Sequence, residues 1–298
     1  MSDEPSDQPP HAPGLPEGLV LVPTPLGNIG DMTDRARATL GAADLVLCED
    51  TRVTARLLAA LGIAGRSLSA LHEHNEDARI AGVLALLRAG KRVALVSDAG
   101  TPLVSDPGYR LVRAAIAAGL AVAALPGANA AVLALVLSGL PPLPFLVMGF
   151  PPPRAGARRA AFARLRDAER AGLAATLIWY EAPHRVAGTL ADLAAAFGDR
   201  PGAVARELTK RYQEVRRGSL PELAALYGQT PPRGEVTLLV GPAPAETPDA
   251  AGLDAALRAA LGSHRVKEAV ALVSAATGLP RRAVYARALA LRGEPESA

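Results

Sequence analysis

The residues best suited to chemistry are two aspartates, Asp98 and Asp106, in the stretch VSDAGTPLVSDPG. The apolar run Val93–Val96 precedes them and predicts a buried strand of a parallel sheet. Ligands of open α/β sheets bind just beyond the carboxyl ends of such strands. We therefore expect Asp98 to accept hydrogen bonds from a ligand, although an ordinary loop with a helix-capping aspartate would also explain the pattern.

Polar residues also follow other predicted strands. Glu49, Asp50 and Arg52 come directly after the apolar run 45–48. They are more than a helix cap requires, so a substrate or phosphate contact is favoured over a plain cap. The Gly- and Pro-rich loop 23–33 can hold an anion or a closely packed ligand. It lacks the spacing of a Walker or GxGxxG loop, and a tight turn explains it equally well.

Two histidines and two glutamates lie within the segment 71–76. Neither the spacing HExxH nor a cysteine ligand accompanies them, so we expect no dedicated metal site. Asn75 or Glu76 instead begins the next helix, and His72 lines a cleft or meets solvent.

The elements that position these residues form two α/β halves and a helical end. Four strand–loop–helix units between Leu19 and Leu140 predict a mostly parallel sheet, and the last helix, apolar on all faces, is expected to be buried. Strand-like runs after the Pro-rich link 141–144 predict a mixed sheet. The expected boundaries are a disordered tail over 1–18, α/β domains over 19–140 and 141–242, a linker over 243–252 and a helical domain over 253–298.

The composition fits a protein with a sizeable core in a reducing setting. Half of the 298 residues are apolar, and the formal net charge is +3. No apolar run reaches the length that spans a bilayer, and the acidic, Pro-rich start resembles neither a signal nor a transit peptide. Cys48 is the single cysteine of the sequence, which excludes an internal disulfide. We expect a cytoplasmic protein.

Two basic stretches suggest a polyanionic partner. Arg154, Arg158 and Arg159 follow three prolines, and a flexible basic loop there would suit RNA; a solvated helix face is the alternative. Three short helices are predicted after residue 252, and the last carries Arg281 and Arg282. Their order is typical of a helix-turn-helix, whereas a packing appendage or a dimer element would explain them as well.

Read together, the motifs resemble one family. They are PTPLGNIGDMT, EDTR, LHEHNE, VSDAGTPLVSDPGYRLV, LPGANA, GFPP, YEAPHR, ARELTK and GEVTLLV. Their order is that of the ribosomal RNA small-subunit methyltransferase I family, a branch of the tetrapyrrole methylase-like (class III) S-adenosylmethionine methyltransferases. The resemblance implies 2′-O-methylation of a cytidine in the decoding region of 16S rRNA in the 30S subunit. It also implies S-adenosylmethionine in a cleft between two α/β domains, and a homodimer.

The resemblance also implies site residues. The expected cofactor contacts are Pro25, Asp98, Ala99, Gly100, Asn129, Ala130, Met148, Ala205 and Thr237. Further cations expected at RNA phosphates are Arg52, Arg185, Arg206 and Lys210. Asn129 departs from the small or hydroxyl-bearing residues usual at its position.

Methyl transfer to a ribose hydroxyl needs in-line alignment and a group that takes the proton. The candidates are Asp106, Glu49, Asp50 and His72, and a carboxylate near the central loop is favoured. Two other functions remain open. A precorrin or uroporphyrinogen C-methyltransferase would share the fold, but the basic stretches argue against it. A non-catalytic RNA-binding ribosome-assembly factor would leave the loop around Asp98 without a role.

Overall fold

The computed structural model describes residues 16–244 and 250–293. Most of the tail expected over 1–18 and the middle of the linker expected over 243–252 therefore lie outside the described residues. The chain divides after Gly241 into two compact units.

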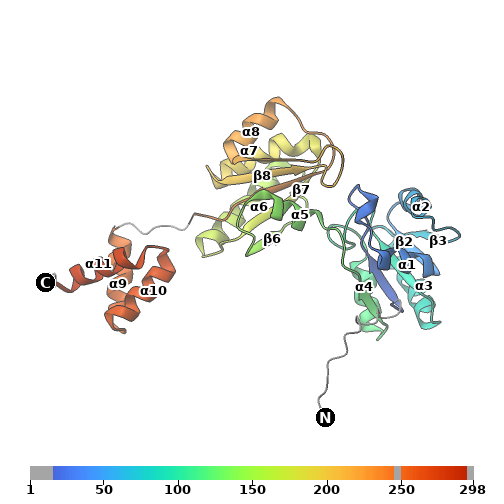
Figure 1. The fold of residues 1–298 in the computed structure, drawn as a ribbon, viewed down its shortest axis with the longest axis horizontal. Helices are drawn as coiled ribbons and strands as arrows, with labels where there is room; N and C mark the ends of the chain where they lie inside the picture. Colours follow the sequence, from blue (N-terminus) through green and yellow to red (C-terminus); the bar gives the residue numbers. More distant parts are fainter. Residues whose placement is uncertain (1–15, 245–249, 294–298) are drawn as a thin grey trace, which may run out of the picture. The chain divides into compact units, whose positions relative to one another are not determined.

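The first unit contains a parallel five-stranded sheet with the strand order β3-β2-β4-β1-β5. Figure 1 labels β2 and β3 of this sheet. Its strands are β1 (Leu19–Val22), β2 (Leu45–Cys48), β3 (Ser67–Ala70), β4 (Val93–Val96) and β5 (Val122–Ala124). The helices that follow them are η1 (Ile29–Asp31), α1 (Asp34–Ala42), α2 (Thr51–Ala60), α3 (Glu76–Arg88) and α4 (Tyr109–Ala117). One face of the sheet packs on α1 and α2 and the other on α3 and α4, as in doubly wound folds.

The prediction of a mostly parallel sheet is confirmed, but the expected four strands are five. β3 was missed because its residues, Ser67 to Ala70, form no apolar run. The strand lies at the sheet edge beside β2 and is only partly buried. An edge strand with one covered face does not need the continuous apolar sequence of a central strand.

The second sheet of this unit is mixed, as predicted, with the order β6-β7-β10-β8-β9. Its strands are β6 (Phe145–Val147), β7 (Thr176–Glu181), β8 (Pro201–Arg206), β9 (Glu214–Ser219) and β10 (Val236–Val240). β6 runs parallel to β7, and the other neighbours are antiparallel. One face carries α6 (Ala155–Arg170), α7 (Val186–Phe197) and α8 (Leu220–Gln229) over a core that includes Phe162 and Trp179. A short turn of helix, η2 (Pro183–Arg185), precedes α7.

The helix α5 (Ala130–Ser138) covers the opposite face of this second sheet. Ala131, Ala134 and Leu135 are buried there, whereas Val132 and Val136 are exposed. The expectation that this apolar helix is buried therefore holds for one of its faces and is wrong for the other. An apolar sequence does not decide how many neighbours a helix receives, and α5 has a sheet on one side only among the described residues.

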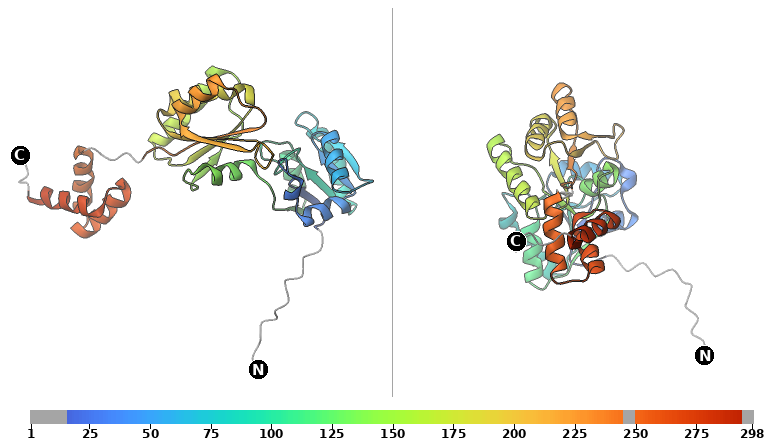
Figure 2. Two further views of the ribbon diagram at one scale, coloured as in Figure 1. Left: turned by 45° about the horizontal axis from the view of Figure 1, so that its top comes forward. Right: turned by 90° about the vertical axis from the view of Figure 1, so that its left-hand side faces the viewer.

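The second unit is a cluster of three helices, as predicted: α9 (Ala250–Leu261), α10 (Val266–Thr277) and α11 (Arg281–Gly293), drawn in red in Figure 2. Its small core contains Leu257, Val273 and Val284. Gly278 ends α10 in the left-handed conformation with φ of 70°, which glycine adopts without strain. Among the described residues of both units, no helix combines the length and the hydropathy needed to cross a membrane.

Candidate functional site

Three loops at the carboxyl edge of the first sheet are hydrogen-bonded to one another. The Thr24 amide donates to the Gly100 carbonyl (2.9 Å) and the Gly100 amide donates back to the Thr24 carbonyl (3.0 Å), which joins the loops after β1 and β4. The Thr101 hydroxyl donates to the Ala128 carbonyl (2.8 Å) in the loop after β5. The loops after β5 and β1 also approach each other closely at Gly127 and Pro23. This approach requires glycine at position 127, because a Cβ there would lie 2.4 Å from a Pro23 carbon.

A pocket of about 340 Å³ opens beside these loops, a volume within the range of small-ligand sites. Its lining comes from both sheets of the first unit. The first sheet and the start of α5 supply Leu26, Asp98, Ala99, Gly100, Thr101, Val104, Ser105, Asp106, Asn129 and Ala130. The second sheet and its loops supply Phe150, Tyr180, Glu181, Ala182, Pro183, Leu208, Gly234, Glu235, Val236 and Thr237.

The charged side chains among these lining residues are all carboxylates: Asp98, Asp106, Glu181 and Glu235. Burial raises the pKa of Asp106 from 3.8 to about 6, and the charges of Glu49 and Asp98 add to the rise. Burial also raises the pKa of Asp98, whose carboxylate accepts a hydrogen bond from the Asp50 amide (3.2 Å). Glu181 and Glu235 are paired with Arg185 and Lys210. The pocket therefore combines apolar walls with two further carboxyl groups, Asp98 and Asp106, and burial raises the pKa of both.

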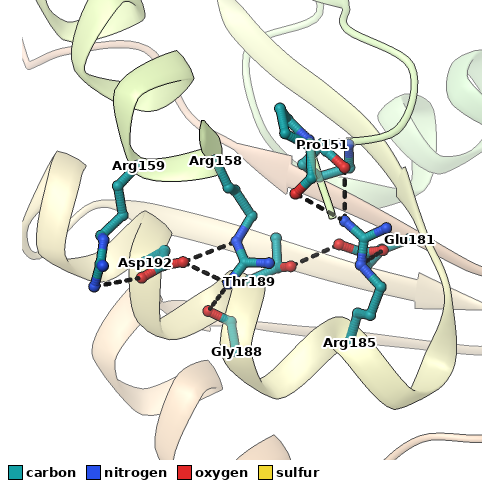
Figure 3. A network of polar contacts seen from close by, with 9 residues as sticks. Pro151, Arg158, Arg159, Glu181, Arg185, Gly188, Thr189 and Asp192 are labelled. Carbon is teal, nitrogen blue, oxygen red and sulfur yellow. Dashed lines mark hydrogen bonds and ion pairs between the residues drawn. The ribbon is translucent and has the colours of Figure 1, made fainter. Parts of the chain in front are cut away.

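Glu181 is buried in the wall of the pocket within a network of polar contacts (Figure 3). Its carboxylate accepts a hydrogen bond from the Thr189 hydroxyl (2.6 Å) and pairs with Arg185 at 3.1 Å. The Arg185 guanidinium in turn donates to the carbonyls of Pro151 (2.6 Å) and Pro152 (3.3 Å). The network thus ties the pocket wall to the Pro-rich loop after β6, and its charge is internally compensated.

Six of the nine expected cofactor residues line this pocket: Asp98, Ala99, Gly100, Asn129, Ala130 and Thr237. Pro25 is the neighbour of the lining residue Leu26, and Ala205 is buried on β8 directly opposite Thr237 of β10. Met148 lies outside the lining and is exposed. Asn129 has a local role, since its side chain accepts a hydrogen bond from the Val132 amide (3.1 Å) and caps α5.

The four candidate proton acceptors lie in different surroundings. Asp106 lines the pocket, and Glu49 is exposed at the end of β2. Asp50 pairs with Arg52 (2.7 Å), and hydrogen bonds from Arg52 lower its pKa to about 2. His72 lies in the loop after β3, with its ring 6.2 Å from that of His74, and does not line the pocket. The segment 71–76 forms no cluster of metal-ligating side chains among the described residues.

The flexible basic loop expected after the prolines is instead a helix, because α6 begins at Ala155. Arg158 is buried on α6, where it donates to the Asp192 carboxylate (2.8 Å) and to the Gly188 carbonyl (3.4 Å) (Figure 3). The expectation that Arg158 binds RNA is therefore wrong, since its charge is already used inside the domain. Arg154 and Arg159 are exposed.

Other expected RNA contacts are also engaged within the chain. Arg206 pairs with Glu214 (2.6 Å), and Lys210 pairs with Glu207 (3.0 Å) and Glu235 (3.1 Å). Arg281 and Arg282 are exposed at the start of α11. Sequence reasoning placed Arg166 on the helix after the basic loop but passed over Arg170, and both share a shallow groove with Arg159 between α6 and α7. Their seven- and four-residue spacing along α6 was a usable signal, since such residues share one helix face.

Sequence reasoning also missed Phe150, Tyr180 and Glu181 as pocket residues. Tyr180 and Glu181 end β7, so the rule that ligands lie beyond strand ends would have selected them. Phe150 carried no such signal, because its place depends on how the loop after β6 meets the first sheet.

Two family models together match most of the chain. The model for tetrapyrrole (corrin/porphyrin) methylases matches residues 18–224, and a model for the RsmI C-terminal HTH domain matches residues 246–292. The fold also resembles solved structures. The methyltransferase CobJ aligns with a TM-score of 0.55 at 24% identity, over 76% of this chain and 94% of its own. A uroporphyrin-III C-methyltransferase from Thermus thermophilus, complexed with S-adenyl homocysteine, aligns with a TM-score of 0.51 at 20% identity, over 75% and 97%. Identities this low show the shared fold.

Curated relatives are far more similar in sequence. A protein of Micromonospora olivasterospora named ribosomal RNA small subunit methyltransferase I is 49% identical over 90% of this chain and 85% of its own. A protein of the same name from Mesorhizobium japonicum is 43% identical over 93% of both chains. With these identities over nearly complete chains, the protein belongs to the ribosomal RNA small subunit methyltransferase I group of the tetrapyrrole methylase family.

Proposed function

We propose that this protein transfers the methyl group of S-adenosylmethionine to the 2′-hydroxyl of a cytidine in the decoding region of 16S rRNA. The observation that carries the proposal is the pocket between the two sheets, in which Asp106 is partly buried and its pKa is raised to about 6. The names of the relatives support ribosomal RNA of the small subunit as the substrate.

The pocket suits this cofactor in charge and polarity. S-adenosylmethionine supplies an electrophilic methyl group on a positively charged sulfur, and Asp98 and Asp106 are lining carboxylates that form no ion pair with a described residue. Apolar side chains such as Leu26, Leu208 and Val236 offer walls for an adenine ring. The solved relative complexed with S-adenyl homocysteine supports a cofactor of this chemistry in the fold. Asp98 would accept hydrogen bonds from the hydroxyl or amine groups of the cofactor.

Asp106 is the residue that we assign as the proton acceptor. A general base works best when its pKa lies near the working pH, and Asp106 meets this condition. The pKa of Asp50 is too low for a general base, and its carboxylate forms an ion pair with Arg52. Glu49 and His72 do not line the pocket. Glu49 instead acts on Asp106 through its charge. The protein would hold the ribose hydroxyl against Asp106 and in line with the methyl group, which is chiefly a positioning effect.

The partner surfaces are further parts of the proposal. Exposed arginines at the start of α6 and α11, namely Arg154, Arg159, Arg281 and Arg282, would contact RNA phosphates. The helical unit that matches the HTH domain model would add affinity for RNA. A homodimer working in the cytoplasm is the expected form of the enzyme.

Two measurements made in sequence test the proposal. Calorimetric titration with S-adenosylmethionine should show one binding event, and labelled methyl should then pass to a ribose 2′-hydroxyl in unmodified 30S subunits. Binding without transfer to RNA would favour a tetrapyrrole substrate, and a protein that binds RNA without the cofactor would favour an assembly factor. Either result contradicts the proposed function.

A further inference from the structure

Phe150 is an exposed aromatic side chain at the pocket. It is 57% exposed, yet it belongs to the pocket lining together with Asp106 and Tyr180. Aromatic residues make up 3% of this sequence, so the pocket lining, which contains both Phe150 and Tyr180, is enriched in them. The Phe150 and Tyr180 rings lie 5.7 Å apart at an angle of 53°, which leaves Phe150 in contact with a neighbour and still open to solvent.

The backbone on both sides of Phe150 is fixed. Before it, the Tyr180 amide donates to the Gly149 carbonyl (3.0 Å), so the chain continues the pairing of β6 with β7. After it, the carbonyl of Pro151 accepts a hydrogen bond from Arg185, which Glu181 holds in place (Figure 3). Hydrogen bonds therefore hold the loop that carries the Phe150 ring. Little conformational entropy of the loop is lost when a ligand packs on the ring.

The loop of Phe150 also meets the loop of the proposed base. A Cβ added at Gly149 would lie 3.4 Å from the Ser105 hydroxyl oxygen, so the two loops are in close proximity at these residues. Phe150 is the residue after Gly149, and Asp106 is the residue after Ser105. A ribose whose 2′-hydroxyl reaches Asp106 carries its base on the adjoining ring carbon. Unpaired RNA bases are recognised mainly by stacking on aromatic side chains. We propose that Phe150 stacks on the base of the nucleotide being methylated, an inference that rests on the proposed function.

The test compares side chains with and without an aromatic face. Phe150→Leu keeps an apolar side chain and removes the ring, whereas Phe150→Tyr keeps the ring. Stacking on one base is worth about 1–3 kcal/mol, so Phe150→Leu should lower kcat/KM for unmodified 30S subunits by about 5- to 140-fold. Phe150→Tyr should stay within about threefold of the wild type. The Kd for S-adenosylmethionine, measured by calorimetry, should stay within about twofold in both variants.

Tyr212→Leu is the matched control, because Tyr212 is similarly exposed (65%) but lies outside the pocket lining. Its kcat/KM should equal that of the wild type. The proposal fails if Phe150→Leu leaves kcat/KM for the subunits within twofold of the wild type. It also fails if the cofactor Kd rises by the same factor, since Phe150 would then contact the cofactor. Absence of methyl transfer in the wild type would instead overturn the proposed function, so the two failures are distinguishable.

Discussion

The pKa of Asp106 predicts how methyl transfer depends on pH. With a pKa of about 6, this carboxyl is about nine-tenths ionised at pH 7 and about one-tenth ionised at pH 5. If the ionised form takes the proton from the ribose hydroxyl, the rate should fall about 10-fold between these two pH values. An aspartate with the ordinary value of 3.8 would remain ionised, and the rate would hardly change. Asp106→Asn should lose about 10²- to 10⁴-fold, the usual contribution of a general base.

A substitution at Glu49 provides a second test of the pKa of Asp106. Its negative charge helps to raise the pKa of Asp106, after burial itself. Glu49→Gln should therefore move the midpoint of the pH profile to lower pH and leave the rate at pH 8 unchanged. Glu73→Gln is the matched control, since Glu73 is exposed and is not among the charges that shift Asp106. Its midpoint should equal that of the wild type.

The assay is single-turnover transfer of labelled methyl to unmodified 30S subunits at saturating S-adenosylmethionine, from pH 5 to pH 8. Single turnover isolates the chemical step from product release. A flat profile, or an Asp106→Asn variant as fast as the wild type, would refute Asp106 as the base. A Glu49→Gln variant without activity would assign the proton transfer to Glu49 instead.

The raised pKa of Asp106 also predicts how the free energy of unfolding depends on pH. Because folding raises the pKa of Asp106, its ionised form opposes folding: the cost is absent below about pH 4, grows up to about pH 6 and is constant above. The rise from 3.8 to about 6 corresponds to about 3 kcal/mol, and we expect about half of this for a partly exposed group. Asp106→Asn should thus raise the free energy of unfolding in urea at pH 7 by about 1.5 kcal/mol, with the gain vanishing near pH 4. A loss of stability at pH 7 would contradict the burial argument.

Three further predictions concern the cofactor, the helical unit and the core. Asp98→Ala should abolish S-adenosylmethionine binding in calorimetry and spare rRNA binding, and an unchanged cofactor Kd would remove Asp98 from the site. Deleting 253–298 should weaken binding to 30S subunits in a filter assay more than it weakens cofactor binding, and equal effects on both would exclude a role in RNA docking. Arg200→Met should cost about 3–5 kcal/mol in urea unfolding, because Arg200 forms two hydrogen bonds of 2.6 and 2.8 Å with the buried Glu169 carboxylate. Lys91→Met removes the exposed pair with Asp44 and should lower the free energy of unfolding by at most about 1 kcal/mol. Similar losses for Arg200→Met and Lys91→Met would refute the predicted difference between the buried and the exposed pair.

The edge of the first sheet could be predicted because its signals are local. An apolar run such as Val93–Val96 forms a strand wherever both faces are covered, and the small polar residues after it must then lie at the carboxyl edge. Asp98, Asp106 and Asn129 were found in this way or through the family resemblance, and they line one pocket. The capping role of Asn129 is equally local, since its partner Val132 is three residues away.

The sequence by itself thus determined most of the elements, the parallel arrangement of the first sheet and the side of that sheet on which a ligand would lie. The tertiary structure decided which charges remain available and what closes the pocket. Arg158 looks like an RNA contact in the sequence, but Asp192, on another helix, neutralises it. Phe150 and Glu181 line the same pocket as Asp106 because separate sheets meet there. Such pairings join residues far apart in the chain, and local propensity does not encode them, since their energies depend on packing and desolvation that exist only in the folded protein.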